Sequence, residues 1–419
     1  MTILIRQAII TDPGSPWNGQ RKDILVANGI ISRISDKIEK DAGSVIERDG
    51  LQVSPGWVDI FAHFCDPGFE FKETLQTGAL AAAAGGYTHV FVIPNTNPVI
   101  QSKSQVEYIK EKSRSLPVNI HPIGSVSKNA EGKDLAEMYD MYSSGAMAFS
   151  DGLNTVQAAG VMVKALQYVK PFDGVLIQIP QDKSIGANGL VNEGIVSTRL
   201  GLPGKPAIAE EMSVARDIEL ADYAASRLHF TGISTGRSVD MIRSAKEKKV
   251  RVTCSVTPFH LYFTDSDLMD YDTNLKVNPP LRTEENRAAL LAAIHEGVID
   301  CIASHHRPQE WDSKTCEFEY ARYGMIGLET AFGVAGAVGI TADEWVNLSS
   351  INPRKIFRLP DISIQEGQPA DITLFHPGVK YQFEERQIRS KSKNSPFVGR
   401  ELVGSVVGII NGEHVLLNN

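Results

Sequence analysis

The sequence predicts an α/β fold in which eight parallel strands, each followed by a helix, close into a TIM barrel that carries a small β domain. Three observations lead to this prediction. Short apolar runs alternate with helix-like stretches through the middle of the 419-residue chain. Strand-like segments without helices between them occur at both ends. The chain also exceeds the roughly 250 residues of one α/β barrel, which leaves room for an appended domain.

Both ends of the chain are rich in short strands. Near the N-terminus, the runs ILIRQAII and DILVANGIISRI are separated by a turn that contains proline and glycine, as is typical of antiparallel strands. Near the C-terminus, ADITLFHP (370–377) and LVGSVVGIINGEHVLL (402–417) have the same character. We therefore expect residues 1–54 and 360–419 to form one composite β-sandwich domain beside a barrel of residues 55–359.

Eight apolar runs in the middle of the chain are the predicted barrel strands. They are GWVDIFAHF (56–64), THVFVIP (88–94), VNIHPIGSV (118–126), AMAFSD (146–151), GVLIQIP (174–180), RLHFTGIS (227–234), VRVTCSVT (250–257) and DCIASH (300–305). Continuous apolar runs of this length are typical of parallel strands buried on both faces. In such barrels the chemistry lies at the carboxyl ends of the strands, so the candidate functional residues are those that end these runs.

Helix-like stretches separate the predicted strands. The segment 72–86 is rich in alanine and ends on glycine, a residue that commonly terminates helices. The segments 238–249 and 283–297 place apolar residues at helical spacing, with charged residues on the opposite face. The resulting alternation of strand and helix indicates a closed parallel barrel.

Composition excludes several classes of protein. The net charge of −8 argues against a surface for nucleic acid or anionic lipid. No apolar run approaches the roughly 20 residues of a membrane span, and the N-terminus lacks the pattern of a signal peptide. The four cysteines form no CxxC pair, which favours a reducing compartment. We expect a cytoplasmic protein with no nucleic-acid partner and no membrane association.

Several motifs at the predicted strand ends resemble those of the dihydroorotase family of cyclic amidohydrolases, in its long bacterial type. They are PGWVDIFAHFCDPGFEFKETLQTG (55–78), IPNTNP (93–98), AFSDG (148–152), NEGIVSTRLGLPGKPAIAEE (192–211), VTPFHL (256–261), YDTNLKVNPPLRTEENR (271–287) and GMIGLET (324–330). The segment INPRKIF, followed by EGQPADITLF, is similar to the family's passage into its β domain. The resemblance covers nearly the whole chain, in order, and implies a role in pyrimidine biosynthesis.

The resemblance also implies what an active member would carry. The family's site holds one or two zinc ions, bound by a His-x-His pair on strand one, a carboxylate or carbamylated lysine on strand four, and single histidines on strands five and six. Zinc makes bound water acidic enough to supply hydroxide near neutral pH, and an aspartate on strand eight moves the proton. An arginine after the His-x-His pair and an asparagine on strand two hold the substrate carboxylate.

Most of these residues are replaced in this chain. The first histidine of the pair is Phe61, the strand-five histidine is Ile179, and the strand-six histidine is Gly232; none of the three can bind a metal. His305 occupies the place of the catalytic aspartate. Cys65 occupies that of the arginine and cannot make a bidentate contact with a carboxylate. The pattern predicts a catalytically degenerate member of the family.

A few of the family's metal-binding residues remain. His63 is the second histidine of the pair, and Asp151 is the strand-four carboxylate. With His305, and with Cys65 nearby, they could form a single zinc site. The alternative is that His63 hydrogen-bonds Asp151 while His305 is a solvated residue of the barrel mouth. We expect no cofactor, with one zinc ion as the alternative.

Other residues of the motifs have structural interpretations. His89 and His229 lie away from the expected ligand row, where we expect core histidines with satisfied hydrogen bonds. His306 aligns with a histidine of the family and is expected to be structural, and Gln309 replaces a further substrate-contacting histidine.

Two asparagines of the family's pattern, Asn95 and Asn278, are kept. They either preserve a vestigial substrate pocket or cap local loop backbone.

The leading functional hypothesis is a non-catalytic, dihydroorotase-like protein. By resemblance, it would be a structural partner of aspartate transcarbamoylase, as a homodimer. The alternative is an active dihydroorotase, or a related cyclic amidohydrolase, with a degenerate single-metal site. A third possibility is a ligand-binding sensor that uses the pocket of Asn95 and Asn278.

Overall fold

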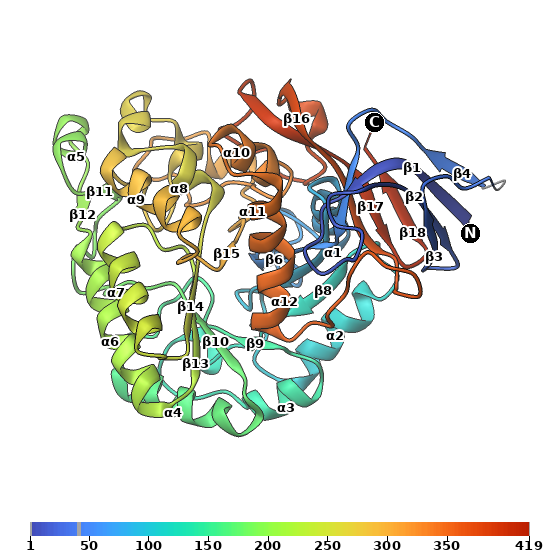
Figure 1. Ribbon diagram of the computed structural model, residues 1–419. Helices are drawn as coiled ribbons and strands as arrows, with labels where there is room; N and C mark the ends of the chain where they lie inside the picture. The colour runs from blue at the N-terminus through green and yellow to red at the C-terminus, as the bar shows by residue number, and fades with distance from the viewer. Residues whose placement is uncertain (1, 40–42, 419) are drawn as a thin grey trace.

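The computed structural model describes residues 2–39 and 43–418 as a barrel with a β domain packed against one side (Figure 1). The strands of this domain come from both ends of the chain, blue and red in the figure, and both termini lie in it. The arrangement confirms the predicted fold class.

Eight parallel strands form the barrel. They are β6 (Trp57–Ala62), β7 (Tyr87–Val92), β8 (Asn119–Pro122), β9 (Ala148–Phe149), β10 (Val175–Gln178), β13 (Arg227–Phe230), β14 (Val252–Val256) and β15 (Cys301–Ile302). Each overlaps one of the eight predicted apolar runs. Parallel ladders join β6 to β8 and β9 to β15, and a bridge between Gly124 and Phe149 connects the two sets.

The barrel closes at a seam between its first and last strands. Asp59 in β6 is fully buried and accepts hydrogen bonds from the amide (2.6 Å) and the hydroxyl (2.9 Å) of Ser304, which follows β15. Beside it, the amide of His63 donates to the carbonyl of His306 over 2.8 Å. Burial raises the pKa of Asp59 to about 6, although the bonds from Ser304 oppose the rise. The seam fixes the direction in which the chain leaves β15.

Helices cover the outside of the barrel. Those that follow β6 to β14 are α1 (Leu75–Ala84), α2 (Lys103–Ser113), α3 (Met138–Ser143), α4 (Ala159–Val169), α6 (Ile208–Ala224), α7 (Gly236–Glu247), α8 (Pro258–Tyr262) and α9 (Glu284–His295). After β15 come α10 (Ala331–Ala337), α11 (Ala342–Val346) and α12 (Asn352–Phe357); between β10 and α6 the chain forms β11 (Val191–Asn192), α5 (Ile195–Leu200) and β12 (Gly204–Lys205). The three helices expected at 72–86, 238–249 and 283–297 are α1, α7 and α9.

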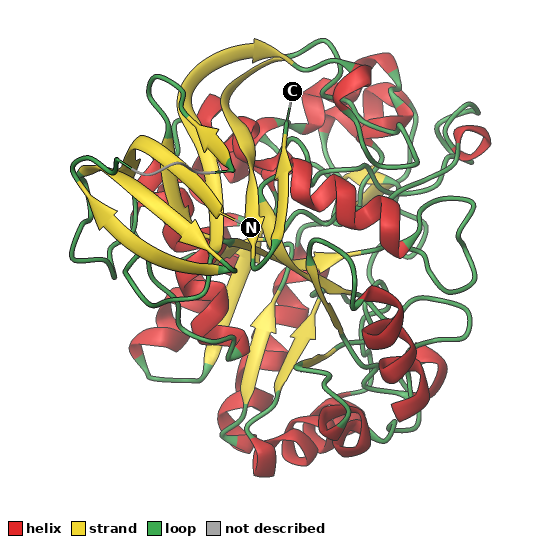
Figure 2. Cartoon of the chain, turned by 90° about the vertical axis from the view of Figure 1, so that its right-hand side faces the viewer, coloured by secondary structure: helices red, strands yellow, loops and turns green. Residues whose placement is uncertain are grey.

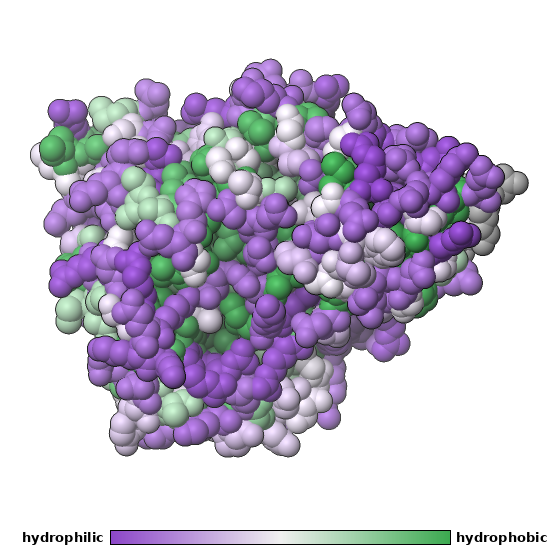
Figure 3. Space-filling view, in the orientation of Figure 1, coloured by the Kyte–Doolittle hydropathy of each residue, from purple (hydrophilic) through white to green (hydrophobic). Residues whose placement is uncertain are grey.

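Among the described residues, no helix combines the length and the apolar character needed to cross a membrane. Figure 3 shows one face of the molecule, where hydrophilic side chains predominate and apolar ones lie in small groups between them.

The β domain is one sheet built from both ends of the chain (Figure 2). From the N-terminal side it takes β1 (Thr2–Ile10), β2 (Arg21–Ala27), β3 (Ile30–Ser35), β4 (Ser44–Ile46) and β5 (Gln52–Pro55); from the C-terminal side it takes β16 (Asp371–Gln382), β17 (Glu401–Asn411) and β18 (His414–Leu417). The order is β18–β17–β16–β5–β1–β2–β3, with β4 paired to β1. The antiparallel pairing of β5 with β16 joins the two halves.

Asp371, at the start of β16, anchors this sheet to the barrel. Its carboxylate lies 2.9 Å from Nε2 of His89 in β7 and accepts a hydrogen bond from Nη2 of Arg354 in α12 over 2.7 Å. His89 also bonds His121 in β8 over 2.9 Å, so it is the satisfied core histidine that the sequence predicts. Burial alone would raise the pKa of Asp371, but His89 and Arg354 hold it well below its usual value.

Removing this anchor is expected to destabilise the protein strongly. Asp371→Ala would leave Arg354, whose side chain is 2% exposed, as an uncompensated buried cation. We expect the free energy of unfolding in urea to fall by about 3–5 kcal/mol. The control Asp36→Ala removes an exposed carboxylate that pairs with Lys22 and should cost about 1 kcal/mol or less. Equal losses in the two variants would contradict the assignment of Asp371 as the anchor.

Candidate active site at the barrel mouth

The carboxyl ends of the barrel strands surround a small cavity. Its volume is about 20 Å³, which is room for about one water molecule. Side chains that line it include Phe61, His63, Phe259, Asn278, His305 and Arg307. Three of the positions where the family's motifs place metal ligands or the catalytic aspartate, Phe61, His63 and His305, therefore line one cavity, and they leave little room between them.

Phe61 and Gly232 both lie against His305. Its ring packs on Phe61, with ring centroids 4.6 Å apart and planes tilted by 32°. Gly232 lies against the imidazole of His305. Any other residue at position 232 would place its Cβ only 2.7 Å from Cε1 of His305. The φ of +71° at this position also favours glycine. A histidine at position 232 would therefore collide with His305. His305 is 8% exposed, so the expectation that it is a solvated residue is wrong.

A chain of hydrogen bonds fixes the His305 ring. Oγ1 of Thr231 lies 2.8 Å from Nε2 of His305 and accepts from Oγ of Ser255 over 2.9 Å. The same Ser255 oxygen lies 3.0 Å from Nε2 of His229, whose Nδ1 is 2.8 Å from Oγ1 of Thr253. All these bonds form together when each hydroxyl in the chain donates in the direction of His305. The hydroxyl of Thr231 then donates to Nε2 of His305 and occupies the lone pair of that nitrogen.

Burial lowers the pKa of both His229 and His305 to about 3, so both rings are neutral at physiological pH. His229 is completely buried and fully hydrogen-bonded, as expected of a core histidine.

His63, the remaining histidine of the pair, bonds to loop backbone. Its Nε2 lies 3.1 Å from the carbonyl oxygen of Asn95 and donates to it. Burial, together with the positive charge of Arg307, lowers the pKa of His63 to about 3. Burial also raises the pKa of the neighbouring Cys65 thiol to about 12. His63 and Cys65 are therefore both uncharged at neutral pH.

Asp151 is bonded to a different part of the barrel. Its carboxylate accepts hydrogen bonds from the amide (2.8 Å) and the hydroxyl of Ser127. Burial raises the pKa of Asp151, although these bonds oppose the rise. The sequence left open a hydrogen bond between His63 and Asp151, and the structure contradicts it.

The single zinc site that the sequence allowed, His63 with Asp151 and His305, is not assembled. Each of the three side chains is hydrogen-bonded to another group, and within residues 2–39 and 43–418 no three His, Cys, Asp or Glu side chains are placed to hold a metal ion. Phe61 and Ile179 belong to one buried apolar cluster. The donor set of this chain therefore does not fit the zinc centre of the family.

Asn95 and Asn278, the two asparagines of the family's pattern, both hydrogen-bond other groups of the chain. The Asn95 amide donates to the carbonyl of Asp151 over 3.1 Å and accepts from the amide of Leu153 over 2.9 Å, so it caps loop backbone. The Asn278 amide accepts from Nζ of Lys205 over 2.7 Å and donates to Gln181 over 3.1 Å. Asn278 lines the cavity, and its amide oxygen and its amide nitrogen each already bond a neighbouring side chain.

His306 and Gln309 hold the loop after β15 in place. His306 is 1% exposed, its Nδ1 accepts from the amide of Gly327 over 3.2 Å, and its Nε2 lies 3.5 Å from the Glu73 carboxylate. Gln309 accepts from Nζ of Lys72 over 2.8 Å. Both contacts are structural, as predicted for His306.

Arg307 is the residue that the sequence analysis missed. Its guanidinium lines the cavity, yet it makes no hydrogen bond or ion pair with any residue that the structure describes. An available signal was its position, directly after His305 and His306 in the strand-eight motif.

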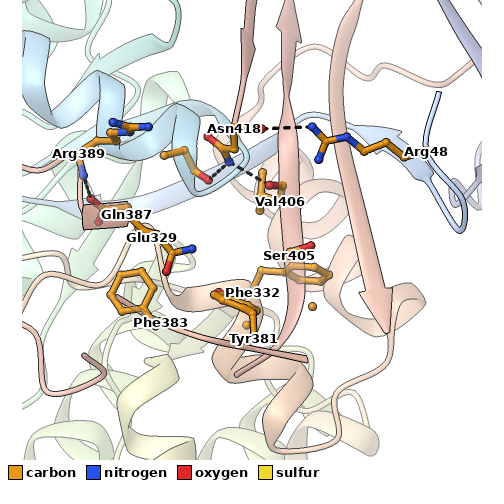
Figure 4. Close-up of a pocket in the computed structure, with 13 residues that line it drawn as sticks. Arg48, Glu329, Phe332, Tyr381, Phe383, Gln387, Arg389, Ser405, Val406 and Asn418 are labelled. Carbon is orange, nitrogen blue, oxygen red and sulfur yellow. Dashed lines mark hydrogen bonds between the residues drawn. The ribbon is translucent and has the colours of Figure 1, made fainter. Parts of the chain in front are cut away.

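A second, larger hollow lies between the barrel and the β domain (Figure 4). It has a volume of about 220 Å³, and its lining includes Arg48, Glu329, Tyr381 and Arg389. Oε1 of Glu329 accepts hydrogen bonds from the backbone amides of Arg389 (3.0 Å) and Ser390 (2.9 Å), so this oxygen already has two partners within the chain. The residues that align with the family's active site line the barrel mouth instead, and we take the mouth as the candidate site.

Comparison with known proteins gives matches along the whole chain. Residues 50–238 match a family described as dihydro-orotase-like, and residues 194–415 match the amidohydrolase family. The chain is 39% identical to the dihydroorotase of Pelotomaculum thermopropionicum, with 100% of this chain and 99% of that protein covered. It is 42% identical to the dihydroorotase of Thermoanaerobacter sp. strain X514, with 93% and 92% covered.

Solved structures share the fold at lower identity. The L-hydantoinase (dihydropyrimidinase) from Arthrobacter aurescens superposes with a TM-score of 0.87 at 22% identity, over 99% of this chain and 96% of that one. The dihydropyrimidinase from Brevibacillus agri gives a TM-score of 0.84 at 20% identity, over 100% and 95%.

We expect acid to destabilise the fold by charging the histidines near the mouth. Burial lowers the pKa of His63, His229 and His305 to about 3 and that of His260 to about 4. The unfolded chain therefore binds protons that the folded chain does not, so this stability is present above about pH 6.5 and is lost as the pH falls toward about 3. Urea unfolding at several pH values across this range measures how steeply the free energy of unfolding falls with pH.

The variant His305→Gln should make the free energy of unfolding depend less steeply on pH, because one buried neutral imidazole is removed. The matched variant His414→Gln removes an exposed histidine of β18 and is the control. A slope that is the same in wild type and His305→Gln would contradict the role given to His305.

Proposed function

This chain belongs to the dihydroorotase family of the amidohydrolases, and from that premise we propose a dihydroorotase-like protein of pyrimidine biosynthesis that no longer catalyses ring hydrolysis. The observation that carries the proposal is the packing of His305 on Phe61 and against Gly232. Where an active member needs open space for hydroxide and a substrate ring, these side chains leave about 20 Å³.

The remaining polar groups do not supply the missing chemistry. Metal activation of water and general acid-base catalysis each account for several kcal/mol of barrier lowering. His305 cannot take over from the aspartate, because its Nε2 accepts from Thr231 and its pKa of about 3 makes it a very weak base. His63 has an equally low pKa and donates to backbone. No group at the mouth is therefore suited to generate hydroxide at neutral pH.

The second candidate function is the alternative that the sequence left open, an active dihydroorotase. The relatives favour it, since proteins about 40% identical over nearly their whole length carry that name. It requires that the mouth rearranges when substrate binds, with His305 leaving its place beside Phe61. The two candidates differ in one measurable property, turnover.

We expect no turnover between carbamoyl aspartate and dihydroorotate in either direction, with or without added zinc. The zinc content of the same preparation should lie well below one ion per chain. The relative from Pelotomaculum thermopropionicum, assayed in the same buffers, is the positive control. Clear turnover that is abolished by His63→Ala would establish the second candidate and overturn the proposal.

A non-catalytic member that keeps the whole fold has a different role, and we propose that it binds aspartate transcarbamoylase as a homodimer. The resemblance to the long bacterial type supports this partner. Exposed aromatic side chains on the loops around the mouth support a docking surface, because aromatic residues are enriched in protein interfaces. Trp311 is 74% exposed and Phe71 is 58% exposed, and the ion pair between Lys72 and Glu310 holds their two loops together.

Co-expression with the transcarbamoylase of the same genome tests the partnership. We expect one complex in size-exclusion chromatography, with a mass that requires two copies of this chain, and a transcarbamoylase more resistant to heat than when expressed alone. Trp311→Ser should weaken the complex, whereas Tyr223→Ser, which removes a side chain 76% exposed on α6, should not. Separate elution of the two proteins would remove the partner claim and leave the non-catalytic proposal standing.

A further inference from the structure

The guanidinium of Arg307 is a cation at the barrel mouth that the chain itself does not neutralise. The side chain is only partly exposed and lines the cavity together with His63 and His305. In the part of the chain that the structure describes, no carboxylate, carbonyl or hydroxyl is bonded to it. By contrast, the nearby cation of Lys72 is paired with Glu310 over 3.4 Å.

The backbone holds Arg307 in this place. Its amide donates to the carbonyl of Met325 over 2.8 Å, and its carbonyl accepts from the side chain of Asn394 over 3.2 Å. Its aliphatic stem packs on Gly324, where a Cβ would lie 2.6 Å from Cδ of Arg307. Gly324 has a φ of +117°, so the chain uses a glycine-specific conformation at the point where the arginine stem passes.

The charges around Arg307 do not compensate it. Burial lowers its pKa to about 10, with a further contribution from Arg322, so the guanidinium stays charged at neutral pH. The positive charge of Arg307 is in turn among the causes that lower the pKa of His63 to about 3 and of Lys314 to about 7. Arg307 therefore places a positive charge at the mouth, and His63 and His305 beside it are uncharged at neutral pH.

A cation withdrawn from water without a partner is costly, and the cost falls when an anion binds. A guanidinium presents paired N–H donors in the geometry of a carboxylate, which makes arginine the usual residue for this recognition. We propose that Arg307 makes the barrel mouth an anion-binding site, which takes either a small inorganic anion or the carboxylate group of a metabolite.

The size of the cavity limits what can bind. About 20 Å³ admits one small group rather than a ring. A larger ligand would have to place its carboxylate at Arg307 and the rest of its structure toward solvent. Asn95 and Asn278, the pocket that the sequence suggested, already bond other groups of the chain, whereas the guanidinium of Arg307 does not.

Ligand-dependent stability tests this inference without any turnover, so the outcome is independent of whether the protein is catalytic. The probes are sodium chloride, L-aspartate, carbamoyl aspartate and dihydroorotate, added to the full-length protein in a zwitterionic buffer. We expect at least one probe to raise the melting temperature saturably, by about 2–4 °C. Saturation by chloride identifies an inorganic anion, and saturation by the carboxylates alone identifies a metabolite.

Three variants separate binding by Arg307 from a general effect of salt. Arg307→Met should weaken the binding of the effective probe by about tenfold or more, while Arg307→Lys should keep part of it because the charge remains. Arg322→Met removes an exposed arginine near the same site and should leave the affinity within about twofold. Without ligand, Arg307→Met should melt at or above the wild-type temperature, because it removes an uncompensated charge.

The inference is overturned if no probe stabilises the wild type more than Arg307→Met, or if Arg322→Met and Arg307→Met lose affinity equally. It is also overturned if Arg307→Met lowers the melting temperature of the ligand-free protein and leaves the response to anions intact, since Arg307 would then be purely structural.

Discussion

The contact between Asp59 and Ser304 is the constraint on which the rest of the barrel mouth depends. It joins the first strand to the last, at the one place around the barrel where the described strands are not connected by a β ladder or bridge. Since His305, His306 and Arg307 follow Ser304 directly, closing the seam determines where all three side chains point. His305 is directed toward Phe61, His306 toward Glu73, and Arg307 into the cavity. The same hydrogen bonds that complete the fold therefore also arrange the candidate site.

The side chains of Phe61 and His305 and the backbone of Gly232 depend on one another at the mouth. Gly232 provides the space that His305 occupies, and Phe61 provides the surface on which it packs. Thr231 then uses the one nitrogen of His305 that could accept a proton or bind a metal. A larger residue at position 232 would conflict with His305, because close-packed interiors tolerate changes in volume poorly.

The fold is held by contacts remote from the mouth. Asp371 binds the β domain to the barrel through His89 and Arg354, and the pairing of β5 with β16 joins the two ends of the chain. None of these contacts uses a residue of the candidate site. The chain can therefore keep the family's architecture while its mouth acquires different properties, including the unpaired cation of Arg307.

The sequence by itself determined the architecture and which residues stand at the family's motif positions. Apolar runs, terminal strands and family motifs are local patterns, and a run such as 227–234 predicts a strand whatever lies beside it. The tertiary structure decided what the remaining polar residues do. His63 bonds to Asn95 rather than Asp151, His305 is buried rather than solvated, and Arg307 has no partner among the described residues. The physical reason is that a hydrogen bond requires two atoms about 3 Å apart in a suitable direction. Those distances are set by strand ends far apart in the sequence, and no local pattern encodes them.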